Sequence, residues 1–148
     1  QPGDLIFIAG GSGLSSPQSM ILDLLEKGDQ RQITLFQGAR NQEELYNSEL
    51  FTDLAEKHNN LTYVPALNDA DDDLSWNGFK CFVHEAAKSH FDGRFANHKA
   101  YLCGPPPMID AAITTLMQGR LFEKDIYMEK FLTAADGADA RRHRRLRL

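Results

Sequence analysis

A glycine-rich turn follows the first apolar run of the chain and precedes the first helical stretch. It reads Gly10-Gly11-Ser12-Gly13-Leu14 and comes directly after Leu5–Ala9. A turn without bulky side chains lets backbone N–H groups and a helix N-terminus approach a pyrophosphate closely. Its spacing does not satisfy the dinucleotide fingerprint G-x-G-x-x-G, so a tight structural connection is the alternative interpretation.

A second segment with chemical potential is Cys103-Gly104-Pro105-Pro106-Pro107-Met108. It stands at the carboxyl end of a predicted strand and opens the next helix. Ligands of open α/β sheets bind at that edge. Prolines also set rigid turns and start helices, so the alternative is a stiff loop around a buried structural cysteine.

The elements that position these segments alternate between strand and helix, which predicts an α/β fold. Short apolar runs predict strands at Leu5–Ala9, Gln32–Phe36, Leu61–Val64, Lys99–Cys103 and Ile126–Met128. Apolar residues at three- or four-residue spacing predict helices at Ser19–Glu26, Glu43–Lys57, Phe79–Ser89 and Met108–Gln118. Right-handed crossovers then give a Rossmann-like, doubly wound, five-stranded parallel sheet.

The charge of the chain is distributed unevenly. The net charge is -5, although Arg141, Arg142, Arg144, Arg145 and Arg147 crowd the last eight residues, so the rest of the chain carries -10. An acidic body repels nucleic acid, and we expect no nucleic-acid partner for it. We expect one domain over residues 1–133 and a disordered basic tail over residues 134–148. The acidic connection Pro65–Gly78 is predicted to be a solvated loop.

Several functions are disfavoured by what the sequence lacks. No apolar run approaches the roughly 20 residues of a membrane helix, and no secretory signal is visible, so a cytoplasmic location is expected. Two cysteines, Cys81 and Cys103, cannot hold an iron–sulfur cluster by themselves. Neither metal-ligand spacing nor a serine elbow is present. Because a strand follows almost at once after Gln1, we expect the chain to be a fragment.

Taken in order, these segments resemble the nucleotide domain of the ferredoxin–NADP reductase family. Gly38-Ala39-Arg40 after the second strand and Glu129-Lys130-Phe131 after the last strand complete the series. Within the family, the series is most similar to reductases of multicomponent monooxygenases, particularly those of bacterial phenol hydroxylases. The resemblance extends to about Thr133. One departure is Ser16, which stands where the family usually has proline; because Pro17 follows it, the helix is predicted to start one residue later.

The resemblance implies roles for individual residues. Cys103 and Glu129 would place the nicotinamide ring and form the catalytic pair, whereas Arg40 would lie beside the adenosine half. Surface solvation is the alternative for Arg40, and core packing is the alternative for Phe131, which would otherwise lie near the flavin. The full set of implied cofactor-binding residues is Gly10, Gly11, Ser12, Gly13, Leu14, Gly38, Arg40, Cys103, Gly104, Pro105, Met108 and Phe131.

The implied reaction is hydride transfer from NADH to FAD, followed by electron transfer through a 2Fe-2S centre to the oxygenase component of an aromatic (phenol) monooxygenase. FAD and the cluster would be bound by other domains of the same parent chain, so the isolated fragment is expected to be inactive. NADH is favoured over NADPH because Glu43, Glu44 and the acidic run Asp69–Asp73 accompany Arg40. The alternatives are a nucleotide-binding module without catalysis and an interaction module whose arginine tail docks on anionic partners.

Overall fold

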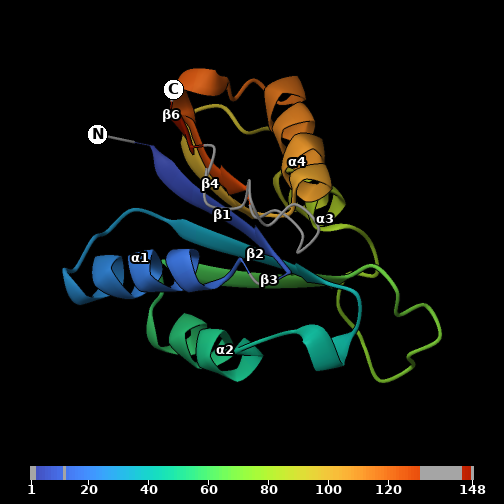
Figure 1. Cartoon of the computed structure of the whole chain (residues 1–148). Coiled ribbons are helices and arrows are strands. Elements are labelled where there is room, and N and C mark those ends of the chain that lie inside the picture. The colour runs from blue at the N-terminus through green and yellow to red at the C-terminus, as the bar shows by residue number, and fades with distance from the viewer. Residues whose placement is uncertain (1–2, 12, 131–144, 148) are drawn as a thin grey trace, which may run out of the picture.

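One mixed sheet with the strand order β3-β2-β1-β4-β5-β6 organises the chain (Figure 1). The computed structural model describes residues 3–11 and 13–130, and the backbone of residues 145–147. Five strands run parallel, which confirms the predicted doubly wound parallel sheet. They are β1 (Asp4–Gly10), β2 (Ile33–Ala39), β3 (Leu61–Leu67), β4 (His98–Gly104) and β5 (Ile126–Lys130).

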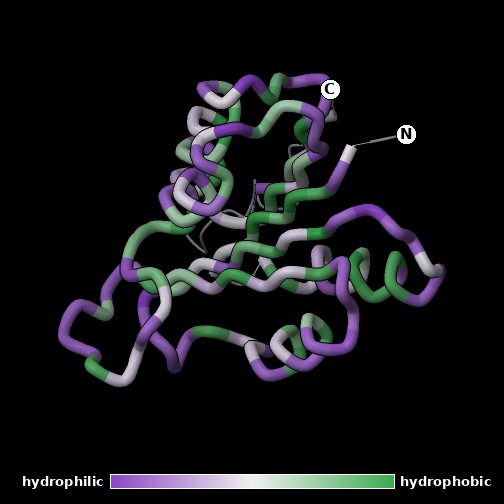
Figure 2. Tube along the Cα trace, turned by 180° about the vertical axis from the view of Figure 1, so that it is seen from behind, coloured by the Kyte–Doolittle hydropathy of each residue, from purple (hydrophilic) through white to green (hydrophobic). Residues whose placement is uncertain are grey.

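Strand β1 is central because it is apolar on both of its faces. Ile6 and Ile8 pack into one core cluster, while Leu5, Phe7 and Ala9 pack into a second cluster on the opposite face. Alternating side chains of a strand point to opposite faces, so an uninterrupted apolar run is required where both faces are covered. Figure 2 shows this arrangement as hydrophobic strands surrounded by hydrophilic loops and helix faces.

Two helices cover each face of the sheet. Helices α1 (Ser15–Glu26) and α2 (Ser48–Lys57) contribute Ile21 and Phe51 to the core cluster that contains Phe7. Helices α3 (Val83–Phe91) and α4 (Pro106–Gln118) cover the other face, where their alanines allow close packing. None of the helices in the described part of the chain is long and apolar enough to cross a membrane.

The start of every predicted helix differs in the structure, and the smallest difference is at α4, which begins at Pro106 rather than at Met108. Helix α1 begins at Ser15, without the predicted delay, because Pro17 lies in its first turn, where no N–H is needed. The predicted helix Glu43–Lys57 is divided into the 3-10 turn η1 (Gln42–Glu44) and α2, since Asn47 adopts a left-handed conformation with φ of 57°. Helix α3 starts at Val83, because Phe82 before it is extended.

The end of the chain contains a strand that the sequence did not predict. After the 3-10 turn η2 (Glu123–Asp125) and β5, the short strand β6 (Arg145–Arg147) pairs antiparallel with β5. The remainder of the predicted tail, residues 134–144 and 148, lies outside the described residues. The tail's predicted disorder and its proposed contacts with anionic partners therefore remain predictions.

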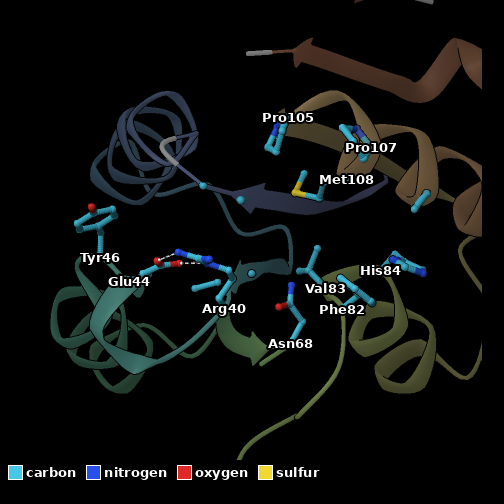
Figure 3. A pocket seen from close by; sticks show the side chains of 15 residues that line it. Arg40, Glu44, Tyr46, Asn68, Phe82, Val83, His84, Pro105, Pro107 and Met108 are labelled. Atoms are coloured by element: carbon cyan, nitrogen blue, oxygen red, sulfur yellow. Dashed lines mark hydrogen bonds and ion pairs between the residues drawn. The ribbon is translucent and has the colours of Figure 1, made fainter. Parts of the chain in front are cut away.

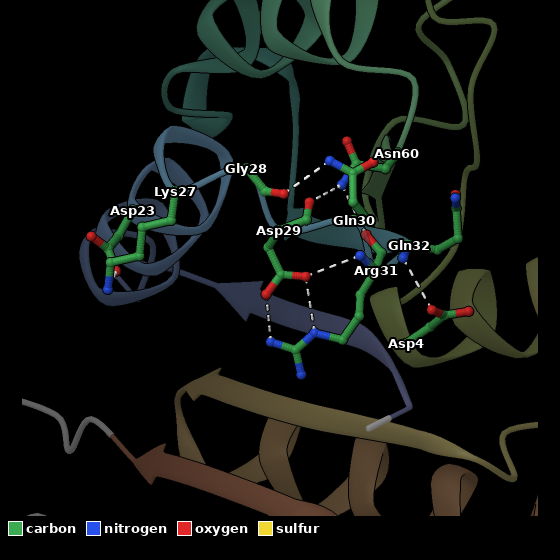
Figure 4. Close-up of polar contacts among 9 residues, drawn as sticks. All are labelled: Asp4, Asp23, Lys27, Gly28, Asp29, Gln30, Arg31, Gln32 and Asn60. Atoms are coloured by element: carbon green, nitrogen blue, oxygen red, sulfur yellow. Dashed lines mark hydrogen bonds and ion pairs between the residues drawn. The ribbon is translucent and has the colours of Figure 1, made fainter. Parts of the chain in front are cut away.

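Polar contacts fasten the amino edge of the sheet (Figure 4). The Asn60 side chain donates to the carbonyl oxygens of Asp29 and Arg31 at 2.8 and 2.9 Å. The Gln32 N–H donates to a carboxylate oxygen of Asp4 at 3.0 Å. These bonds join the starts of β1, β2 and β3, so the opposite, carboxyl edge is the one left open for a ligand.

Replacing a fully buried aromatic residue of β2 should test the packing. We expect Phe36→Ala to lower the free energy of unfolding by about 3–5 kcal/mol, because it empties a site packed against His90 and Phe91. The measurement is urea denaturation followed by circular dichroism. Leu74→Ala is the control, since Leu74 is 91% exposed, and it should change stability by less than about 0.5 kcal/mol. Equal effects would contradict this core assignment.

Candidate functional site

The loops after β1 and β4 touch each other at the carboxyl edge. Gly11 has a φ of +59°, and the Gly13 N–H donates to the Gly10 carbonyl at 2.9 Å, which closes the turn. A Cβ atom at Gly104 would lie 3.3 Å from the Gly10 carbonyl oxygen, and one at Gly11 would lie 3.7 Å from Pro105. The absence of a side chain at Gly104 therefore lets the two backbone loops lie close together, and Gly11 supplies the left-handed conformation of the first turn.

Met108 packs over this junction. A Cβ atom at Gly10 would lie only 2.3 Å from the Met108 sulfur, and one at Gly104 would lie 2.7 Å from its terminal methyl group. The space that these two glycines leave is thus occupied by the methionine, whose unbranched side chain fits irregular gaps. A side chain at Gly10 or Gly104 would therefore have to displace the end of the Met108 side chain.

Helices α1 and α4 both begin at this edge, but they offer different groups to an anion. The first residues of α4, Pro106 and Pro107, carry no amide hydrogen. At the start of α1, no side chain of the described residues caps the backbone N–H groups. Free N–H groups and the helix dipole together favour a negatively charged ligand. The N-terminus of α1 therefore offers an anion more free backbone N–H groups than the N-terminus of α4 does.

The larger cavity at this edge has a volume of about 720 Å³ (Figure 3). It is bounded by the two glycine loops, the end of β2, the η1 region and the first residues of α3 and α4. Its lining residues are Gly10, Gly11, Gly38, Ala39, Arg40, Glu44, Tyr46, Asn68, Phe82, Val83, His84, Pro105, Pro107, Met108 and Ala111.

Two exposed aromatic side chains border this larger cavity from different elements. Tyr46 is 60% exposed, and its backbone carbonyl accepts a hydrogen bond from the buried Gln37 side chain at 2.8 Å. Phe82 is 55% exposed, and its N–H donates to the Glu85 carboxylate at 3.1 Å. Fixed backbones with solvent-facing rings suit the binding of a flat heterocycle.

The permanently charged groups of the larger cavity form an ion pair. Arg40 donates to Glu44 through Nε at 3.0 Å and through Nη2 at 2.5 Å, so the contact is bidentate. The Arg40 guanidinium holds the pKa of the Glu44 carboxyl below its usual range, and Glu44 in turn raises the pKa of Arg40. Both side chains are solvent-accessible, so the pair contributes little to stability.

A smaller cavity of about 420 Å³ contains the predicted catalytic pair. Cys103 and Glu129 are directly opposite in the pairing of β4 with β5, and both line this cavity with the start of α1. Cys103 is only 3% exposed. Burial, with a further contribution from the negative charge of Glu129, raises the pKa of Cys103 to about 12. The thiol is therefore neutral at physiological pH and is not activated as a nucleophile.

The two cavities divide most of the predicted site residues between them. The larger cavity receives Gly10, Gly11, Gly38, Arg40, Pro105 and Met108, and the smaller cavity receives Cys103 and Glu129. Gly13 closes the first turn, Gly104 packs against Met108, and Leu14 is buried in the core cluster beneath α1. Ser12 and Phe131 lie outside the described residues, so their implied contacts remain predictions.

Several lining residues were not singled out as binding residues in the sequence. Phe82 was assigned to a helix interior; Glu85, three residues later, indicates instead that the helix starts after Phe82. Asn68 reaches the larger cavity because its N–H donates to the Ala39 carbonyl at 3.0 Å. Tyr46 depends on the left-handed turn at Asn47, which the helical pattern did not reveal.

Comparison with known proteins identifies an oxidoreductase family and two similar proteins of phenol hydroxylation systems. The model of the family described as the oxidoreductase NAD-binding domain matches residues 7–114. The reductase component DmpP of phenol 2-monooxygenase from Pseudomonas sp. (strain CF600) is 79% identical over 93% of the chain. The phenol hydroxylase P5 protein of Acinetobacter pittii (strain PHEA-2) is 65% identical over 90% of it. The chain spans 39% and 38% of these relatives' lengths.

Solved structures with the same fold give a consistent result. The Amycolatopsis cytochrome P450 reductase GcoB aligns with a TM-score of 0.79 and 28% identity, over 90% of this chain and 39% of its own. The cytochrome b5 reductase domain of Ulva prolifera nitrate reductase aligns with a TM-score of 0.76 over 86% of this chain and 50% of its own; at 19% identity it supports the fold alone. These comparisons confirm the resemblance predicted from the motifs.

The state of Cys103 can be measured by thiolate absorbance near 240 nm. Titrating the folded chain from pH 7 to about 10.5 and subtracting the curve of Cys103→Ser should show almost no thiolate from Cys103, because its pKa is about 12. Glu129→Gln should lower that pKa, since the nearby negative charge is removed. Circular dichroism at each pH confirms that the chain stays folded. A Cys103 thiolate signal at pH 8 would contradict the assignment of a neutral thiol.

Proposed function

The chain belongs to the oxidoreductase NAD-binding domain family, and we propose that it is the NADH-binding domain of a reductase that supplies electrons to a phenol monooxygenase. The arrangement of the two cavities carries this proposal. The end of β4 connects the two cavities, because Cys103 lines the smaller one and Pro105 lines the larger one. The β1 loop adds Gly10 and Gly11 to the larger cavity, and the α1 helix that follows this loop adds its first residues to the smaller cavity. An extended dinucleotide crossing the loops would place one end in each.

The residues present fit the two ends of such a cofactor. The adenosine half would occupy the larger cavity between Tyr46 and Phe82. The pyrophosphate would lie against Gly10-Gly11 and the N-terminus of α1, where Gly11 adopts a φ of +59° that L side chains rarely take. The nicotinamide would reach Cys103 and Glu129 in the smaller cavity.

Bound NADH supplies a hydride from the C4 position of its reduced ring, and a flavin in the complete reductase accepts it. The side chains of this domain orient the ring. The neutral thiol of Cys103 can contact the ring without reacting with it, and the Glu129 carboxylate can accept a hydrogen bond from a carboxamide group. Holding the donor carbon at a near-attack distance is the contribution of the protein.

We propose NADH rather than NADPH as the physiological donor. A 2′-phosphate needs a free cation, whereas the guanidinium of Arg40 is already engaged by Glu44. The acidic loop adds Asp69, whose N–H donates to the Arg40 carbonyl at 2.9 Å. Carboxylates beside the 2′ position repel a phosphate, but they can accept hydrogen bonds from a ribose diol.

Electron transfer beyond the nicotinamide requires parts of the reductase outside this chain. The relatives are more than twice as long as the matched segment. Within the described residues, no group of His, Cys, Asp and Glu side chains is arranged to hold a metal ion. We propose that FAD and a 2Fe-2S centre are bound by the remaining domains of the parent chain, which then serve the oxygenase component.

Calorimetric titration with NADH and NADPH tests this function directly. We expect NADH to bind more tightly than NADPH. Phe82→Ala should weaken NADH binding by about tenfold or more, because an aromatic contact with a base contributes roughly 1–3 kcal/mol. Phe122→Ala is the matched control, since Phe122 is also about half exposed but does not line either cavity.

The outcomes separate the parts of the proposal. An equal loss of NADH affinity in Phe82→Ala and Phe122→Ala would contradict the placement of adenosine beside Phe82. Tighter binding of NADPH would contradict the choice of cofactor. If the folded chain bound neither nucleotide, the assignment of an NADH-binding site to this chain would be wrong.

A further inference from the structure

We propose that Glu44 is the residue that selects against a 2′-phosphate, by keeping the guanidinium of Arg40 engaged within the larger cavity. The inference rests on the proposed function, because it concerns the adenosine end of the same site. A general excess of negative charge around the cavity would repel the phosphate without any particular residue. Here the selectivity is assigned to one ion pair, and its two members can be changed separately.

Arg40 is the cation that could otherwise recognise a phosphate. Among the described residues lining the larger cavity, it is the one permanently charged positive group. Guanidinium groups bind phosphate and carboxylate oxygens with the same bidentate geometry. The two hydrogen bonds from Arg40 to Glu44 therefore use the donors that a 2′-phosphate would need.

Local backbone structure holds Glu44 in place for this contact. The Glu44 N–H lies 3.1 Å from the side-chain oxygen and 3.2 Å from the backbone carbonyl of Asn41. The Gln42 side chain donates to Asp73 and Ser75 at 2.7 and 2.9 Å. The 3-10 turn η1 is thus fastened at its first residue, Gln42, and at its last residue, Glu44, so Glu44 is presented to Arg40 by a defined turn.

The acidic loop strengthens the effect of the pair. Backbone bonds join Asn68 to Ala39 and Asp69 to Arg40, so the loop runs beside the end of β2. The charge of Asp69 reinforces that of Glu44 in raising the pKa of Arg40. A phosphate arriving here must displace Glu44 and then remain close to two carboxylates, whereas a neutral diol leaves the ion pair intact.

The experiment uses two ligands that differ by one phosphate group. Adenosine 5′-monophosphate and adenosine 2′,5′-bisphosphate are titrated calorimetrically into the 148-residue chain and into Glu44→Gln. We expect Glu44→Gln to increase the affinity for the bisphosphate about tenfold relative to the monophosphate, because a charge-assisted hydrogen bond to Arg40 becomes available.

Two further variants make the result specific. Arg40→Gln/Glu44→Gln should remove the gain, because the cation that binds the phosphate is absent. Asp23→Asn breaks another exposed i,i+4 ion pair, Asp23 with Lys27, which is drawn in Figure 4 and lies away from both cavities. Asp23→Asn changes the net charge by the same amount as Glu44→Gln does. The ratio of the affinities for the bisphosphate and the monophosphate should nevertheless stay at the wild-type value.

The alternatives are distinguishable. If Glu44→Gln alters both affinities equally, or if the gain persists without Arg40, this inference is overturned while NADH binding still supports the proposed function. If neither adenosine ligand nor NADH binds to the folded wild-type chain, the proposed site and the inference fail together.

Discussion

The site depends on the close approach of two backbone loops at the carboxyl ends of adjacent parallel strands. Ala9 and Cys103 are directly paired, so Gly10 and Gly104 must leave the sheet side by side. Met108 fills the space beside both glycines, and any larger residue would compete with it for that volume. Gly10 and Gly104 therefore serve both core packing and ligand access. One side of each loop packs against the core, and the other side faces a cavity.

Much of this arrangement could be predicted because it is determined by local sequence. Apolar runs located the five parallel strands, since a strand covered on both faces needs uninterrupted hydrophobic residues. Glycine and proline marked the ends of β1 and β4, where only particular backbone conformations are possible. Parallel connectivity then brought Gly11, Arg40 and Cys103 to one edge. The motifs thus placed residues that are far apart in the chain at one edge of the sheet.

The remainder could not be predicted because it depends on side chains that meet after folding. Nothing in the helical pattern of Glu43–Lys57 showed that Asn47 would turn left-handed and expose Tyr46. The acidic run Asp69–Asp73 predicted a solvated loop, but its attachment to η1 depends on contacts between Gln42 and Asp73 that span 31 residues. Strand β6 pairs with β5 through backbone groups, which hydrophobic periodicity does not report.

The two ends of the proposed nucleotide site are controlled by different physics. At the smaller cavity, burial keeps the Cys103 thiol neutral, so this side chain can position a ligand by steric contact and not by charge. At the larger cavity, Arg40 and Glu44 are solvent-accessible, so charge acts there without a large cost in desolvation. The charged pair Arg40–Glu44 follows β2, whereas Cys103 and Glu129 lie on β4 and β5. Cofactor selection could therefore change at one end without altering how the reacting ring is held at the other.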